Sequence, residues 1–238
     1  MNLDVLVFAA HPDDAELAMG GTIAKFTSVN KKVGIIDFTR GELGTRGTAE
    51  SRQKEAFQSA LIIKAALREN LEMPDGNIQR NKDNLMKVIM AIRRYKPKII
   101  FAPYFNDRHP DHIDASLLVK EAMFSSGLIK VKTSDREVAQ AAYRPQKLYY
   151  YMQTYTFDPS FIVDITETFE TKMEAVRCYG SQFHNPRSTE PETFISRPEF
   201  ISYIESRANF YGFQIGKKCG EPFYCEENIE RHVEELLK

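Results

Sequence analysis

Apolar runs alternate with helical patterns along the first half of the chain. Leu3–Ala10 and Lys98–Pro103 are nearly continuous apolar runs, which are typical of strands buried on both faces of a parallel sheet. Lys32–Thr39 predicts another strand, and Asn84–Tyr95 carries its apolar residues at helical spacing. Because strand and helix alternate from residue 3 to about residue 125, the pattern predicts a parallel sheet with helices on both faces.

The remaining elements follow from the same patterns. The helix expected after the first strand contains Gly20 and Gly21, and since glycine weakens a helix, we expect close packing or the approach of a ligand there. The other expected elements, in chain order, are a glycine-rich loop at Arg40–Thr48, a helix at Thr48–Leu67, a short strand at Leu71–Met73, a helix at His112–Phe124, strands at Lys147–Met152 and Phe161–Ile165, a helix at Thr166–Tyr179, a long loop at Gln182–Pro198, and helices at Pro198–Tyr211 and Asn228–Lys238.

These elements predict one α/β domain over residues 1–238, because the sequence shows neither an internal repeat nor a convincing linker. We expect a Rossmann-like three-layer fold with a mostly parallel sheet and an active site at the carboxyl ends of its strands. Residues 1–125 would form the Rossmann-like core. Residues 126–238 would complete the sheet and cover the mouth of the active site.

Composition narrows the class of partner. Of 238 residues, 42% are hydrophobic and 27% charged, as in ordinary globular proteins. A net charge of −1 gives no general basic field that would attract nucleic acid or an anionic membrane, and no apolar run reaches the 18 residues of a membrane-spanning helix. Three cysteines without a CxxC motif, and an acidic Asp4 where a signal peptide would be basic, favour a reduced cytoplasmic protein.

Candidate chemistry is concentrated in two short segments that follow strands. His11-Pro12-Asp13-Asp14 comes after the first predicted strand, and Asp107-Arg108-His109-Pro110-Asp111-His112 comes after Lys98–Pro103. Together they hold three of the five histidines in the chain. Since the carboxyl ends of parallel strands meet at one edge of a sheet, these side chains are expected to converge.

Imidazole and carboxylate groups suit zinc, and three protein ligands leave a coordination position for a water molecule. A nearby carboxylate can accept the proton of that water, and Asp13 is placed for this role. Taken alone, each His-Pro-Asp segment could instead be a turn whose aspartate caps a helix. The occurrence of both segments at strand ends favours a metal site.

The sequence resembles the LmbE-like (PIG-L-type) N-acetylglucosaminyl deacetylases. The resemblance rests first on Ala10-His11-Pro12-Asp13-Asp14 and on Arg108-His109-Pro110-Asp111-His112, with Gly20-Gly21-Thr22 between them. Further segments resemble the bacillithiol-biosynthesis branch, which deacetylates N-acetylglucosaminyl-malate. These segments are Gly20–Lys25, Arg52-x-x-Glu55-Ala56, Met73-Pro74-Asp75, Phe101–Tyr104, Glu121-Ala122-x-Phe124-Ser125 and Ser181–Phe183. The resemblance extends over nearly the whole chain.

The resemblance implies a role for each site residue. Zinc would be held by His11, Asp14 and His112, although Fe(II) suits the same ligands. Asp13 would be the general base. Asp111 would orient a histidine, for which His109 is the expected partner, and His109 would protonate the leaving amine or stabilise the oxyanion. Arg52 would contact the substrate, Arg108 would support the site, and the chain would form a homo-oligomer, possibly a hexamer as in relatives.

One position departs from the family pattern. Related enzymes bring a tyrosine from a C-terminal segment to the oxyanion, and Phe200 stands at the corresponding place. Phenylalanine donates no hydrogen bond. Tyr203, one helical turn further, could take its place.

The glycine-rich loop at Arg40–Thr48 suggests a second contact with the substrate. Arg40 and Arg46 flank its glycines, and guanidinium groups suit carboxylates, of which malate has two. The alternative interpretation is a surface loop with solvated arginines.

The residues predict a zinc-dependent hydrolase, and the resemblance implies that it removes the acetyl group from N-acetylglucosaminyl-malate, with no nucleic acid or membrane as partner. A first alternative is the same reaction on a chitooligosaccharide or an antibiotic precursor. A second is a nucleotide-binding α/β module, but the chain has no G-x-G-x-x-G after its first strand.

Overall fold

The computed structural model describes residues 1–186, 188–230 and 232–237 and is built around a seven-stranded sheet. Its strand order is β3-β2-β1-β4-β7-β9-β8. The strands are β1 (Val5–Ala9), β2 (Val33–Asp37), β3 (Leu67–Asn70), β4 (Ile99–Pro103), β7 (Lys147–Tyr151), β8 (Phe161–Asp164) and β9 (Gly220–Tyr224). Strands β3, β2, β1, β4 and β7 are parallel neighbours, and β9 runs antiparallel to both β7 and β8. The predicted mostly parallel α/β fold is confirmed.

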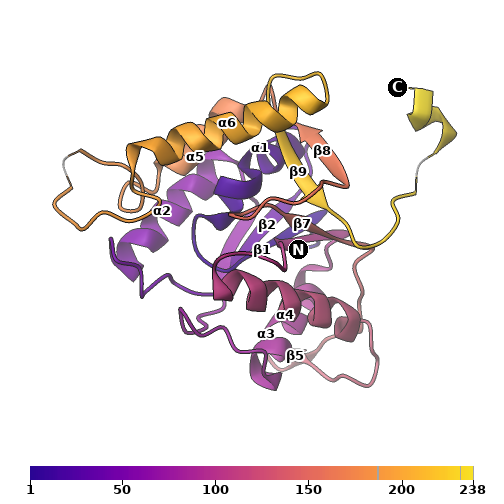
Figure 1. The fold of residues 1–238 in the computed structure, drawn as a ribbon. Coiled ribbons are helices and arrows are strands. Elements are labelled where there is room, and N and C mark those ends of the chain that lie inside the picture. The colour runs from indigo at the N-terminus through magenta and orange to yellow at the C-terminus, as the bar shows by residue number, and fades with distance from the viewer. Residues whose placement is uncertain (187, 231, 238) are drawn as a thin grey trace.

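Two layers of helices cover the sheet (Figure 1). The helices are α1 (Asp14–Ser28), α2 (Ala49–Ile62), α3 (Lys82–Tyr95), α4 (Pro110–Ser126), α5 (Phe169–Arg177) and α6 (Pro198–Gln214). Alternate residues of β1 serve the two faces: Leu6 and Phe8 pack in the core beneath α3 and α4, whereas Val5 and Val7 pack in the core beneath α1. This two-sided burial explains why the strand is a continuous apolar run.

The C-terminal part completes the same sheet. Strands β7, β9 and β8 extend it beyond β4, while α5 packs against α1 and α6 against β9. A small hairpin of β5 (Ser134–Asp135) and β6 (Val138–Ala139) lies beside α3. The part of the chain that the structure describes contains no helix with the length and apolar character needed to span a lipid bilayer.

Three expected elements differ in the structure. The helix expected to continue to Leu67 ends at Ile62, because Lys64 adopts a left-handed conformation with φ of 53° and the chain turns into β3. Strand β3 therefore lies at Leu67–Asn70, before the expected Leu71–Met73. The expected terminal helix at Asn228–Lys238 is a 3₁₀ turn at Val233–Leu237, and positions 231 and 238 lie outside the described residues.

Strand β9 was not predicted from the sequence. It contains Pro222, which lacks the N–H group of a central strand, and the acidic Glu221. These two residues are unusual in a buried strand, so the sequence pattern does not predict β9, although it lies between β7 and β8.

Candidate metal centre and active site

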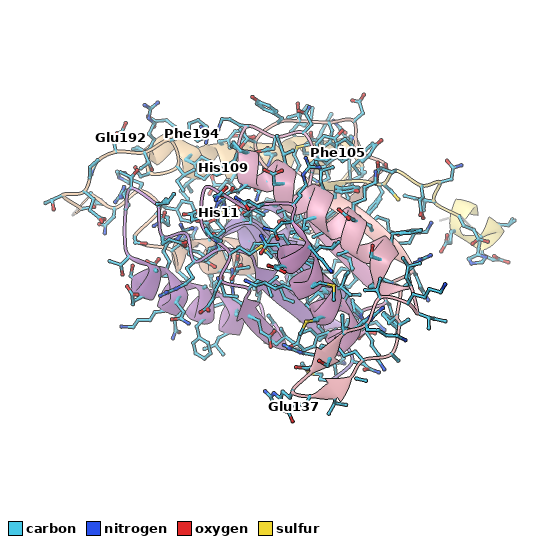
Figure 2. The ribbon with its side chains drawn as sticks, turned by 90° about the horizontal axis from the view of Figure 1, so that it is seen from below. His11, Phe105, His109, Glu137, Glu192 and Phe194 are labelled. Carbon is cyan, nitrogen blue, oxygen red and sulfur yellow. The ribbon has the colours of Figure 1, made fainter. Side chains whose placement is uncertain are left out.

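The two segments predicted to carry the chemistry meet at the carboxyl ends of β1 and β4. Figure 2 shows His11 and His109 close together, and their ring centroids are 4.7 Å apart. Asp13, between β1 and α1, has a φ of 117°, which is rare for a residue with a side chain. Such strain persists where the surrounding structure holds a functional geometry.

His11, Asp14 and His112 form a buried group whose ligand atoms all lie within 4.8 Å of one another. Asp14 stands between the histidines: its Oδ2 is 3.5 Å from Nδ1 of His11, and its Oδ1 is 3.3 Å from Nε2 of His112. These three residues can hold one metal ion, as the resemblance implies.

The ring nitrogens of His11 and His112 that point away from Asp14 each face another carboxylate. Nδ1 of His112 lies 2.8 Å from Oδ1 of Asp107, and Nε2 of His11 lies 3.1 Å from Asp75 and 3.2 Å from Asp111. A neutral imidazole that donates its N–H to these carboxylates leaves its other nitrogen unprotonated toward Asp14. Carboxylates of this kind fix the orientation and tautomer of metal-binding histidines.

The partner of Asp111 differs from the expected one. Its carboxylate contacts His11 and accepts N–H groups from Gly76 and Ile78, whereas His109 accepts the backbone N–H of Asp111 through Nδ1 at 3.2 Å. Because burial and the neighbouring histidines lower the pKa of His109, its ring is neutral at neutral pH and carries its proton on Nε2. His109 is therefore a donor at the wall of the cavity.

Asp13 lies beside this group and is held by Arg52. Nη2 of Arg52 donates to Oδ2 of Asp13 at 3.1 Å and to the carbonyl of Pro12 at 2.6 Å, while Nη1 donates to the carbonyl of Gly41. Burial raises the pKa of Asp13 to about 7, although Arg52 opposes the rise. A base with such a pKa is suited to proton transfer at neutral pH.

The donor set fits a bound cation. Five carboxylates, those of Asp13, Asp14, Asp75, Asp107 and Asp111, surround His11, His112 and Arg52, and these eight residues are called the metal group below. The hydrogen bond from His11 lowers the pKa of Asp75 to about 2 against the effect of burial, so that acid is ionised. Buried acids in such excess are stabilised by a positive ion, and imidazole with carboxylate is a donor set that zinc accepts.

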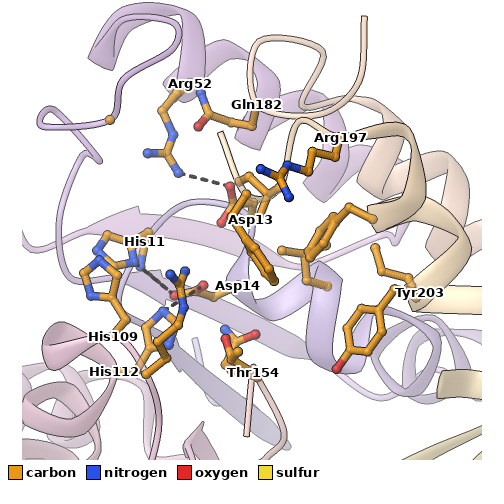
Figure 3. A pocket seen from close by; sticks show the side chains of 18 of the residues that line it. His11, Asp13, Asp14, Arg52, His109, His112, Thr154, Gln182, Arg197 and Tyr203 are labelled. Carbon is orange, nitrogen blue, oxygen red and sulfur yellow. Dashed lines mark hydrogen bonds and ion pairs between the residues drawn. The ribbon is translucent and has the colours of Figure 1, made fainter. Parts of the chain in front are cut away.

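A cavity of about 830 Å³ opens beside the metal group (Figure 3). Its polar end contains His11, Asp13, Asp14, Arg52, Asp75, His109 and His112. Its other walls are largely apolar, with Leu17, Leu43, Phe194, Ile195, Phe200 and Ile204. Three further arginines, Arg108, Arg197 and Arg207, also line it. The cavity therefore combines a reactive end with room for a larger conjugate.

The structure places the C-terminal aromatic residues on the opposite wall. Phe200 lines the cavity and stacks on Phe183 at 5.9 Å between ring centroids. Tyr203 also lines the cavity, but Figure 3 shows it across the cavity from the three histidines. The geometry thus gives Tyr203 no contact with the metal group.

The predicted loop arginines lie away from the cavity. Arg40 borders a separate hollow and pairs with Glu50 at 3.0 Å, and Arg46 is buried with its Nε 3.7 Å from Glu190. Neither residue lines the cavity, so the geometry gives no support to their predicted contact with the substrate.

Sequence reasoning missed Asp75, Asp107 and Gln153 as functional residues. Asp107 belongs to the second segment but had no assigned role, and Asp75 was named only in a segment that carries the family resemblance. Asp107 comes after the predicted strand Lys98–Pro103, so a search of that strand end for polar groups would have found it. Asp75 follows β3, and the place of β3 in the sheet brings it to the site. Gln153, which follows β7 and lines the cavity, carries no sequence signal.

Comparison with known proteins gives a consistent result. Residues 6–123 match the family model PIG-L, described as GlcNAc-PI de-N-acetylase. Diacetylchitobiose deacetylase of Thermococcus kodakarensis is 29% identical over 96% of this chain and 85% of its own length. A conserved protein of Thermus thermophilus has a solved structure with a TM-score of 0.86, and it is 34% identical over 97% of each chain.

One similar protein is named for a different reaction. 4-Oxalmesaconate hydratase of Pseudomonas putida is 25% identical to this chain over 75% of the chain and 74% of its own length.

Proposed function

We propose, from the premise that the chain belongs to the PIG-L family of de-N-acetylases, that it is a zinc-dependent hydrolase acting on a small N-acetylglucosamine conjugate. The observation that carries this proposal is the convergence of His11, Asp14 and His112 beside Asp13 at the end of a large cavity. The enzyme class follows from family membership. The substrate and the identity of the metal are our proposals.

The side chains divide the reaction between them. A bound zinc ion would supply Lewis acidity for the acetyl carbonyl and activate water. Asp13 takes the proton of the attacking water, and Arg52 keeps the Asp13 carboxylate in place. Asp13 then returns this proton to the nitrogen of the departing amine, and the Nε2–H group of His109 donates a hydrogen bond to the developing oxyanion. Acetate and a free amine are the products.

A two-sugar substrate fits the shape of the cavity. The volume of about 830 Å³ exceeds what one acetamido group at the metal end requires, and the outer walls carry Phe194, Phe200 and Tyr203. Aromatic side chains offer flat apolar faces against which a second ring can pack. The Thermococcus relative is named for such a disaccharide, so N,N′-diacetylchitobiose is our first candidate.

N-Acetylglucosaminyl-malate is the second candidate, because Arg108 is available for a carboxylate. Its guanidinium lies over the ring of Phe194 at 4.9 Å and pairs with no carboxylate of the described residues. Arg197 also lines the cavity. An anionic conjugate would provide the partner that Arg108 lacks.

Acetate release tests the proposal. The purified protein is loaded with zinc and given each conjugate, with and without a chelator, alongside an Asp13→Asn variant. We expect release from at least one conjugate, its loss on chelation, and a reduction of about 100- to 10,000-fold in the variant. Hydration of an unsaturated dicarboxylate is the control reaction. Hydration without any acetate release would overturn the proposal.

A further inference from the structure

Gln153 is a buried polar residue whose side chain has no partner in the described part of the chain. It follows β7 and lines the cavity, and it is only 7% exposed. Its Nε2 atom makes no hydrogen bond and is inaccessible to solvent. A buried donor without a partner is costly, so such a group in a cavity wall points to a ligand that completes it.

The backbone around Gln153, unlike its side chain, is held by hydrogen bonds. The carbonyl of Gln153 accepts a hydrogen bond from Nη1 of Arg207 at 2.6 Å. The N–H of the next residue, Thr154, donates to Oδ2 of Asp107 at 2.8 Å, and Asp107 orients His112. These bonds therefore hold the backbone at Gln153 between α6 and the metal group.

We infer that the Gln153 amide binds a hydroxyl group of the sugar ring that carries the acetamido group. An amide offers both a donor and an acceptor, and a hydroxyl group can complete both. The terminal torsion of glutamine is broad, so the amide can turn either atom toward the ligand. This inference rests on the proposed function and extends it by naming a residue that recognises the sugar.

The charges around Gln153 are mixed. Asp107 and Asp14 belong to the adjacent metal group, whereas the guanidinium of Arg207, which also lines the cavity, donates to the carbonyl of Gln153. These charges do not favour an anionic group over a neutral hydroxyl at this position. The arginines of the outer cavity, Arg108 and Arg197, are the better position for an anionic group.

A substitution that keeps the shape separates recognition from structure. Gln153→Met removes the polar atoms at nearly constant volume. Because replacing an unpartnered buried donor by an apolar group is neutral or favourable, we expect the melting temperature of the variant to equal or exceed that of the unchanged protein. A residue kept for function rather than stability gives this combination of unchanged stability and lost activity.

Thr22→Val is the matched control. The hydroxyl of Thr22 is also buried and unpartnered, but Thr22 does not line the cavity. The control should likewise keep its melting temperature, and its kcat/KM should not change.

The ligand comparison uses a diacetylated disaccharide and N-acetylcyclohexylamine, which has the ring and the amide but no hydroxyl. We expect Gln153→Met to reduce kcat/KM for the disaccharide about tenfold or more and to leave that for N-acetylcyclohexylamine unchanged. Calorimetric binding in an Asp13→Asn background should show the same difference without turnover.

Two results would overturn the inference. A melting temperature several degrees below that of the unchanged protein would show that Gln153 is structural. Equal losses for the two ligands would show that it does not recognise a hydroxyl group. Absence of acetate release by the unchanged protein would instead refute the proposed function, so the two failures are distinguishable.

Discussion

Two of the buried charged clusters along helix α1 differ in whether their charges are balanced. The metal group stands at the beginning of the helix, around Asp13 and Asp14. The second cluster stands at the middle, where Lys172 and Glu221 form an ion pair of 2.6 Å with each side chain 2% exposed. One cluster faces the cavity, and the other is enclosed by protein.

The Lys172–Glu221 pair is complete without any ligand. Oε1 of Glu221 accepts from Lys172 and from the N–H of Gly21, and Oε2 accepts from the N–H of Thr22. These N–H groups are free of hydrogen bonds within the helix because α1 is kinked at Met19, whose φ is −139°. The pair therefore acts as a cap for the second half of the helix.

The metal group, in contrast, is incomplete. Its acids outnumber its bases, and one ring nitrogen of His11 and one of His112 face the same Asp14 carboxylate. The comparison teaches that burial of charge alone does not identify a functional site. In the metal group the two imidazoles and the Asp14 carboxylate also converge beside the large cavity, where a bound cation would balance the excess of acids.

The largest expected effect is that of His112→Ala. Removal of this ligand should release the metal, and with it both Lewis acidity and the use of Asp13, so kcat/KM should fall at least about 10,000-fold. Metal content by mass spectrometry and acetate release are the measurements. His184→Ala is the control, since His184 is exposed and does not line the cavity. Retention of stoichiometric metal in His112→Ala would contradict the assigned ligand set.

Lys172→Met should act on stability rather than on chemistry. It leaves Glu221 buried and unpaired, which costs about 3–5 kcal/mol in the free energy of unfolding. Denaturant unfolding measures the loss, and metal content should not change. The double variant Lys172→Met/Glu221→Gln should recover part of the stability, because no unpaired charge remains. If Lys172→Met lost its metal while remaining folded, the two clusters would not be independent.

Asp107→Asn tests the orientation of His112. An amide at this position places N–H₂ against the N–H groups that Asp107 now accepts, so metal affinity should fall about 10- to 100-fold. Competition with a chromogenic chelator measures it. Asp114→Asn, on the same helix as His112 but paired with Arg80 at the surface, should bind metal as before. Equal affinities for the two variants would remove Asp107 from its positioning role.

The sequence could predict the site residues that are adjacent in the chain better than those that come from separate strands. His11, Asp13 and Asp14 are adjacent in the chain, so their local spacing and the strand before them were enough to predict their position. Asp75 and Gln153 reach the site from other strand ends, and their positions depend on the order of strands in the sheet. That order could not be obtained from periodicity.

The middle of α1 also shows what local sequence patterns can predict and what they cannot. Gly20 and Gly21 predicted close packing, which is confirmed: a side chain on Gly21 would lie 2.8 Å from Ile165, and one on Gly20 would lie 3.2 Å from Lys172. The residue that caps the kink, Glu221, comes from β9, whose proline concealed the strand. The two glycines thus predicted close packing in the middle of α1, but not which residues would pack there.

The smallest expected effects come from the arginines, and they decide which end of the cavity recognises a conjugate. Arg40 is paired with Glu50 outside the cavity, so Arg40→Ala should change stability by less than about 0.5 kcal/mol and leave KM unchanged. Arg108→Ala should raise KM for N-acetylglucosaminyl-malate about tenfold, because a charge-assisted hydrogen bond is lost, and should not change KM for diacetylchitobiose. Steady-state kinetics with both substrates measures the difference. If Arg40→Ala raised KM for the malate conjugate and Arg108→Ala did not, the glycine-rich loop would be the anion-binding element, and it would have to move toward the metal group when substrate binds.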